Sequence, residues 1–215
     1  MIIKNIFGDL MKVFLINGSP HKNGCTNEAL TEIKNELEKC DVDSEIFWIG
    51  TKPVRGCIAC GKCVEDGFCV FDDDPANEMI QKIIDSDAVI VGSPVYYAGP
   101  NGALCALLDR VFYQNGGRFS HKPGAAVISC RRSGSTASFD RLNKYFTISG
   151  MPVVSSTYWN AVHGNTPEEV RQDKEGLHTM RTLARNMAWM LKAIENEPKP
   201  ILEEKEFTNF IRPFK

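Results

Sequence analysis

The chain has 215 residues, enough for one large domain with a substantial core. Its 43% apolar and 24% charged residues are typical of a globular protein and exclude a disordered chain. The net charge of −2 argues against nucleic-acid and anionic-membrane partners, and no apolar run is long enough to span a bilayer. Eight cysteines without a recognisable export signal predict a reducing compartment, so we expect a cytoplasmic protein.

Short apolar runs alternate with helical patterns along the chain. The apolar runs predict buried strands at 12–17, 44–49, 87–94, 124–130 and 151–157. The helical patterns predict helices at 26–40, 77–86, 101–112, 136–150 and 167–195. The strict alternation of strands and helices predicts an α/β domain with a parallel sheet and helices on both faces. This domain is expected to lie between an N-terminal arm at 1–10 and a tail at 198–215. Because such sheets bind ligands at the carboxyl ends of their strands, the loops after strands one, three and four are the candidate site.

The loop after the first strand, "NGSPHKNGCTNEAL" (17–30), has the composition of an anion-binding turn. Gly18 and Gly24 permit tight turns of the backbone just before a helix begins. Its small polar side chains are Ser19, Asn23, Thr26 and Asn27. The loop matches neither G-x-G-x-x-G nor an ATP-binding P-loop. A plain helix cap is the alternative, but the position after the first strand favours phosphate binding.

The loop after the third strand lies in "GSPVYYAGPNGALCALLDRVF" (92–112), and two adjacent tyrosines emerge from it. Pro94, Gly99 and Pro100 predict a rigid segment without regular ladder bonds. Such a wall can pack on a flat heterocycle and offer amides to its polar edge. The alternative is a pair of half-buried tyrosines at a strand end.

The loop after the fourth strand, in "SCRRSGSTASFD" (129–140), carries adjacent arginines. Two neighbouring cations usually form a solvated pair. The position of Arg131 and Arg132 at the same sheet end favours a contact with a ring edge or a phosphate.

Together these three loops resemble the flavodoxin-like NAD(P)H-dependent FMN reductase family, over about residues 11 to 195. The resemblance implies a flavodoxin-like doubly wound five-stranded parallel sheet of order 2-1-3-4-5 within a domain at 11–197, with FMN bound at the carboxyl edge. It implies these contacts to the phosphate: Ser19, Lys22, Asn23, Cys25, Thr26 and Asn27. It implies these contacts to the isoalloxazine ring: Pro94, Val95, Tyr96, Tyr97, Arg131, Arg132, Ser133 and Gly134. Cys25 departs from the Asn or Ser of relatives, and since a thiol is a poor donor we expect its backbone N–H to make the contact.

No nucleophile–base pair is visible, which fits an enzyme whose flavin performs the redox step. The scattered histidines are expected in ordinary surface or packing roles, although His163, after the fifth strand, is positioned to edge the flavin site. The acidic run at 72–74 resembles a carboxylate cluster. Solvated loop charge and capping of the next helix explain it better.

A cysteine-rich loop at 56–70, "GCIACGKCVEDGFC" and the next residue, has the spacing C-x2-C-x2-C-x5-C. Its cysteines are Cys57, Cys60, Cys63 and Cys69. The first three cysteines have the C-x2-C-x2-C spacing of bacterial iron–sulfur sites, but no proline follows the fourth. Zinc sites usually separate two C-x2-C pairs, and disulfides need an oxidising compartment. Iron–sulfur ligation, free or oxidised thiols and zinc therefore all stay open.

Within the family this loop resembles the cysteine motif of the iron–sulfur flavoproteins. That resemblance implies a [4Fe–4S] cluster on these four cysteines that exchanges electrons with FMN in a neighbouring subunit. Cys40, Cys105 and Cys130 fall on helix or strand patterns and are expected as small core residues.

The expected function is an FMN-dependent oxidoreductase that passes electrons from NAD(P)H or a ferredoxin-like protein to a small acceptor. A non-catalytic flavodoxin-like carrier is the alternative, although such shuttles are typically smaller and more acidic. We expect a homodimer or homotetramer. The tail is too apolar for a solvated segment, which predicts that four of its residues pack on a neighbouring subunit: Phe207, Phe210, Ile211 and Phe214.

Overall fold

A computed structural model describes residues 11–201, 203–204, 206 and 208 of the chain. The predicted arm at 1–10 and the apolar residues Phe207, Phe210, Ile211 and Phe214 lie outside the described residues. The subunit packing expected of the tail therefore stays a prediction. Within the described part of the chain, no helix is both long enough and apolar enough to cross a membrane.

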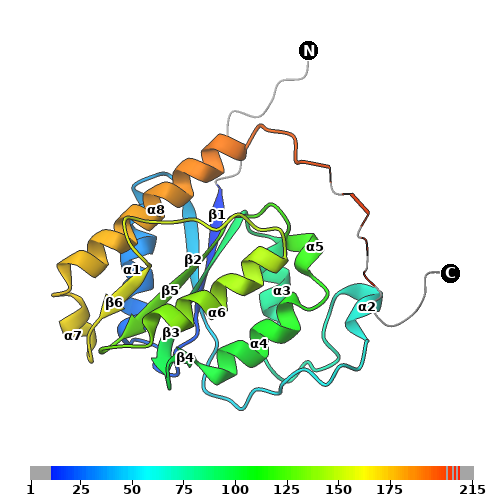
Figure 1. Ribbon diagram of the computed structural model, residues 1–215, viewed down its shortest axis with the longest axis horizontal. Helices are drawn as coiled ribbons and strands as arrows, with labels where there is room; N and C mark the ends of the chain where they lie inside the picture. The colour runs from blue at the N-terminus through cyan, green and yellow to red at the C-terminus, as the bar shows by residue number, and fades with distance from the viewer. Residues whose placement is uncertain (1–10, 202, 205, 207, 209–215) are drawn as a thin grey trace.

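Five parallel strands form the centre of the fold (Figure 1). They are β1 (Lys12–Asn17), β2 (Asp43–Trp48), β3 (Ala88–Tyr96), β5 (Gly124–Cys130) and β6 (Ala161–His163). Their spatial order is β2-β1-β3-β5-β6, which confirms the expected order 2-1-3-4-5 when the parallel strands are numbered along the chain. A two-residue strand, β4 (Gly99–Pro100), folds back antiparallel against the end of β3.

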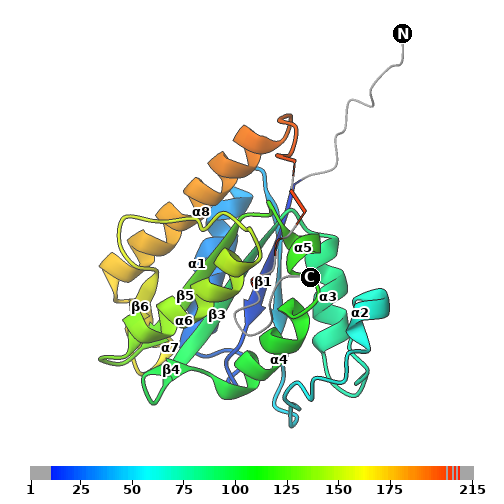
Figure 2. The same cartoon turned by 45° about the vertical axis from the view of Figure 1, so that its right-hand side comes forward.

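Helices cover both faces of the sheet, because successive side chains of a strand point to opposite sides. Val13 and Leu15 face the core shared with α1 (Cys25–Glu38) and α8 (Lys174–Ile194). Phe14 and Ile16 face the core of the other layer. That layer contains α3 (Ala76–Ile84), α4 (Gly102–Phe112) and α6 (Ser135–Ile148). Figures 1 and 2 show these two layers, with the short helices α7 (Pro167–Val170) and α2 (Cys63–Asp66) toward opposite ends of the molecule. A third short helix, α5 (Gly116–Phe119), lies beside α3.

The fifth parallel strand lies later in the chain than the sequence predicts. Residues 151–157 make only an isolated bridge, between Val153 and Gly124, and the strand itself is β6. Met151 and Val154 are buried, which explains the apolar signal, but the chain then leaves the sheet edge. It returns at Asn160, whose carbonyl accepts the N–H of Ile128 at 2.8 Å. Burial alone therefore misplaces the strand, because pairing needs backbone hydrogen bonds as well.

The predicted helix at 167–195 is two helices, α7 and α8. Asp173 separates them and caps α8, where its carboxylate accepts the backbone N–H of Gly176 at 2.9 Å. The same carboxylate accepts the N–H of His163 at 2.6 Å and so ties β6 to the start of α8. An aspartate that bonds nearby backbone groups favours a helix N-terminus over a helix interior.

Candidate functional site

The loop between β1 and α1 is held in shape by Asn17, the last residue of β1. Its fully buried side chain accepts the N–H of Ser19 at 3.1 Å and donates to the carbonyl of Lys22 at 3.0 Å. Gly18 donates its N–H to the carbonyl of Gly92 in β3 at 2.9 Å. A Cβ on Gly18 would approach that carbonyl oxygen to 2.8 Å, so this close crossing requires glycine.

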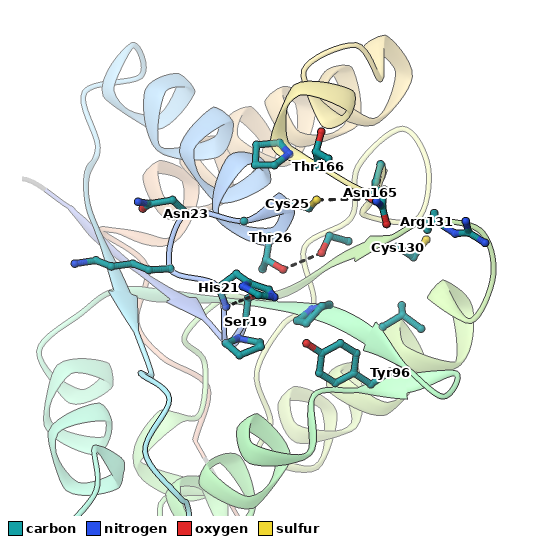
Figure 3. Close-up of a pocket in the computed structure, with 18 of the residues that line it drawn as sticks. Ser19, His21, Asn23, Cys25, Thr26, Tyr96, Cys130, Arg131, Asn165 and Thr166 are labelled. Atoms are coloured by element: carbon teal, nitrogen blue, oxygen red, sulfur yellow. Dashed lines mark hydrogen bonds between the residues drawn. The ribbon is translucent and has the colours of Figure 1, made fainter.

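A pocket of about 800 Å³ opens at the carboxyl edge of the sheet, a size typical of small-molecule and cofactor sites (Figure 3). The predicted contacts that line it are Ser19, Lys22, Asn23, Cys25, Thr26, Pro94, Val95, Tyr96 and Arg131. The loops after β1, β3 and β5 therefore meet as the sequence predicts. Figure 3 shows Tyr96 on one side of this pocket, with Asn165 and Thr166 on the opposite side and His21, Cys25 and Thr26 between them.

The pocket is suited to an anion. The N-terminus of α1 opens into it, and no side chain caps that helix at Gly24. Uncapped amides and the helix dipole favour negative charge at this point. His21, Lys22 and Arg131 line the pocket, and its described lining contains no carboxylate.

Two thiols line the pocket without adding charge. Burial raises the pKa of the Cys25 thiol, whose Sγ donates to the carbonyl of Gly164 at 3.7 Å. Burial also raises the pKa of Cys130, at the end of β5. Both are therefore protonated near neutral pH, and the net charge of the lining is positive. This arrangement offers no activated thiolate nucleophile.

Five of the predicted contacts do not line the pocket: Asn27, Tyr97, Arg132, Ser133 and Gly134. Asn27 accepts a hydrogen bond from the side chain of Asn17 at 3.4 Å. Tyr97 is fully exposed, at the turn between β3 and β4. Gly134 precedes α6 with a φ of 90°, where a Cβ would lie 2.8 Å from the Cα of Ala98. His163 also stays outside, and its Nδ1 lies 3.6 Å from Asp173.

Other lining residues were not among the contacts predicted from the sequence: Pro20, His21, Gly24, Trp48, Ser129, Cys130, Gly164, Asn165, Thr166 and Pro167. Trp48 ends β2, and its indole N–H donates to the carbonyl of Ser19 at 2.8 Å. Its position at a strand end was the one available signal. The segment 164–167 was missed because the fifth strand was placed too early. Ser129 Oγ lies 2.8 Å from Thr26 Oγ1 and joins β5 to α1.

The cysteine-rich loop forms a second, much smaller cavity of about 20 Å³. Cys57, Cys60, Cys63 and Cys69 all line it, although they come from irregular backbone, from α2 and from the segment after α2. Cys57 and Cys60 are exposed, whereas Cys63 and Cys69 are half-buried. Burial raises the pKa of the Cys63 thiol, and the neighbouring sulfurs raise it further. All four cysteines therefore line one small cavity.

In the described residues, no three Cys, His, Asp or Glu side chains converge as the ligands of a single metal ion do. A cuboidal iron–sulfur cluster does not require its cysteine ligands to converge on one metal ion, because each thiolate binds a different iron. An all-cysteine donor set around one cavity fits that requirement. The chemistry of the four side chains thus suits an iron–sulfur cluster.

The acidic run beside this loop departs from its prediction. Asp72 and Asp73 are exposed, and Asp73 pairs with Arg55 at 3.2 Å, as expected of solvated charge. The prediction is wrong for Asp74, whose side chain is 2% exposed and forms a buried ion pair with Arg110. Asp74 also accepts the N–H of Ala76 at 3.1 Å, so the expected capping is present. A buried arginine on α4 requires such a partner, and the local sequence does not reveal which acid supplies it.

Comparison with known proteins shows the family to which this chain belongs. Residues 11–166 match the family described as NADPH-dependent FMN reductase. The chain is 32% identical over 193 residues to an iron–sulfur flavoprotein of Methanocaldococcus jannaschii, which covers 86% of this chain and 100% of that relative. It is 29% identical over 190 residues to an iron–sulfur flavoprotein of Methanosarcina thermophila, covering 86% and 97% of the two chains.

The fold resembles that of a solved flavodoxin from the domain Archaea. The TM-score is 0.58 at 18% identity, covering 85% of this chain and 99% of the flavodoxin. The fold is therefore flavodoxin-like, in agreement with the strand order. From the family match and the relatives together, the chain belongs to the NADPH-dependent FMN reductase family, in its iron–sulfur flavoprotein branch.

Proposed function

We propose that this chain is an FMN-dependent oxidoreductase that passes electrons from a reduced donor to a small acceptor. The donor is NAD(P)H or a ferredoxin-like protein, and a [4Fe–4S] cluster on the cysteine-rich loop takes part. The observation that carries the proposal is the pocket at the carboxyl edge of the sheet, where an uncapped helix N-terminus meets His21, Lys22 and Arg131 without a carboxylate. The family match supports flavin oxidoreductase chemistry and FMN as the cofactor.

The residues of the pocket divide into two groups by chemistry. The amides at the start of α1, together with Ser19 and Lys22, form the polar part that suits the phosphate. Pro94, Val95 and Tyr96 form a more apolar part of the lining that suits the ring system. Bound FMN supplies the redox chemistry, and the protein positions and tunes it.

The cysteine-rich loop supplies the ligands of the proposed cluster. Its cavity of about 20 Å³ is close to the space of a single water, so the loop would have to open to admit a cluster, which these four cysteines would then hold. Cys57 and Cys60 lie on exposed, irregular backbone that can make this movement. The curated relatives named iron–sulfur flavoproteins support the assignment.

The proposed assembly is a homodimer or homotetramer. The flavin pocket and the cysteine cavity have no lining residue in common. This separation is compatible with electron exchange between the cluster of one subunit and the FMN of another, as the family resemblance implies. Truncation after Pro198 is expected to weaken the oligomer, and an unchanged oligomer on size-exclusion chromatography would contradict the role given to the tail.

The decisive experiment is the visible spectrum of protein purified without oxygen, combined with FMN, iron and acid-labile sulfide analysis. We expect one FMN per chain, iron and sulfide in a cluster ratio, and steady-state turnover with NADPH and a quinone. Bound FMN without turnover would favour the alternative of a flavodoxin-like carrier. Bound FMN without iron would eliminate the cluster while leaving the flavin enzyme intact.

A further inference from the structure

Arg110 uses every hydrogen-bond donor of its side chain in the cysteine-rich region. It lies on α4 and is 3% exposed. Its Nε donates to the Sγ of Cys69 at 3.1 Å. Its Nη1 donates to the carbonyl of Arg55 at 3.2 Å and to Asp74. Its Nη2 donates to the carbonyl of Phe71 at 3.4 Å and to Asp74 at 3.0 Å. A guanidinium has five N–H groups in a rigid fork, and here each one has a partner.

Asp74 fixes the orientation of this fork. Its side chain is 2% exposed and contacts both Nη atoms of Arg110, which is the bidentate geometry that restricts an arginine most strongly. The remaining donor, Nε–H, is thereby directed at the sulfur of Cys69. The ion pair with Asp74 uses only the Nη atoms of Arg110. The hydrogen bond from Nε to the sulfur of Cys69 is therefore an additional contact that the ion pair does not require.

Cys69 is also the most firmly held of the four cysteines. Asn77 accepts its N–H at 2.7 Å and donates to its carbonyl at 3.0 Å. Cys57 and Cys60, in contrast, are exposed. Among the described residues, Cys69 is the only one of the four whose sulfur receives a hydrogen bond from a charged donor. Hydrogen bonds thus hold Cys69 in place, whereas Cys57 and Cys60 are exposed.

We propose that Arg110 is a positioning residue for the cluster: it holds Cys69 as the fixed ligand and raises the reduction potential of the cluster through the Nε–H···Sγ hydrogen bond. This inference rests on the cluster of the proposed function. Reduction adds one electron from the donor to the cluster, and hence one negative charge. A cationic hydrogen-bond donor at a ligand sulfur stabilises that added charge, and such bonds are among the factors that set cluster potentials.

Two variants separate this role from simple packing. Arg110→Lys keeps a positive charge beside Asp74 but removes the planar fork that reaches Cys69. The double variant Asp74→Asn with Arg110→Gln replaces the ion pair by neutral amides, so that no buried charge is left without a partner. Arg118→Gln is the matched control. Arg118 is an exposed cation beside the same loop that donates to Asn115 at 3.1 Å and to the carbonyl of Asp66 at 3.5 Å, but among the described residues it forms no hydrogen bond with a cysteine sulfur.

The measurement is the midpoint potential of the cluster in anaerobically purified full-length protein, followed by spectroscopic redox titration, with iron, sulfide and FMN determined on each sample. We expect a more negative midpoint in both Arg110 variants and an unchanged midpoint in Arg118→Gln. Loss of iron from the Arg110 variants, with FMN retained and Arg118→Gln fully loaded, also supports the proposal. Equal iron loss from all variants would overturn it.

Two other results overturn it in distinguishable ways. Intact clusters with unchanged midpoints in both Arg110 variants would refute the role of Arg110 and leave the proposed function standing. Wild-type protein with FMN but neither iron nor sulfide would remove the cluster itself, and this inference with it.

Discussion

At the scale of single residues, polar side chains hold the proposed flavin pocket in shape. Trp48 makes two contacts with the loop between β1 and α1. Its indole N–H bonds the carbonyl of Ser19, and the ammonium of Lys22 lies 5.8 Å from the centre of its ring. A cation over an aromatic face is attracted to it, so the side chain of Trp48 stabilises both the backbone of the loop and the position of the Lys22 ammonium.

The first prediction concerns this indole. Trp48→Phe keeps an aromatic ring but leaves the carbonyl of Ser19 without its donor, a loss of about 0.5–1.5 kcal/mol. FMN affinity is expected to fall about twofold to tenfold, as followed by quenching of flavin fluorescence. Trp189→Phe is the control, because Trp189 is exposed on α8 and does not line the pocket. Equal dissociation constants for Trp48→Phe and wild type would show that this hydrogen bond is dispensable.

At the scale of elements, the turn between β3 and β4 meets the start of α6. Tyr97 and Ala98 both have positive φ, 50° and 58°, in a conformation that glycine adopts more readily. Gly134 lies directly against Ala98, with its own φ at 90°. Gly134, for which a ring contact was predicted, makes a close backbone approach to Ala98 that supports the turn after Tyr96.

The second prediction compares two glycines. Gly134→Ala is expected to lower the free energy of unfolding by about 1–3 kcal/mol, because it adds a strained φ and a clash with Ala98. Gly102→Ala should leave stability unchanged or raise it by up to about 1 kcal/mol, since Gly102 begins α4 and has open space around it. Urea denaturation measures both. A Gly134 variant as stable as wild type would contradict the close approach.

At the scale of the whole molecule, the two cavities depend on different parts of the fold. The proposed flavin pocket lies where the loops after β1, β3 and β5 meet. Val54, just before the cysteine-rich loop, and Phe68, within it, pack against the core of the layer containing α3 and α4. Because the cavities have no lining residue in common, their ligands are expected to bind independently.

The third prediction tests this independence. The double variant Cys57→Ser with Cys60→Ser should lose iron while FMN affinity stays that of wild type and stability changes by less than about 0.5 kcal/mol, because both side chains are exposed. Iron analysis, flavin titration and thermal unfolding give the three readouts. Cys40→Ser, at the end of α1, is the control that keeps its iron. A large fall in FMN affinity would show that the two sites are coupled.

Local patterns in the amino-acid sequence were enough for a parallel sheet, the layers of helices and the three loops that meet at the large pocket, whereas the strand order came from the resemblance to the family. These features can be predicted because the patterns that specify them, alternating apolar residues and turn-forming residues, extend over only a few neighbouring positions of the chain. The part of the site at 164–167 and the place of β6 depended on where the chain rejoined the edge of β5. The contact of Arg110 with Cys69 and Asp74 joins residues 41 and 36 positions apart. No local pattern encodes which buried cation meets which acid or thiol, because that follows from how α4 packs against the cysteine-rich loop.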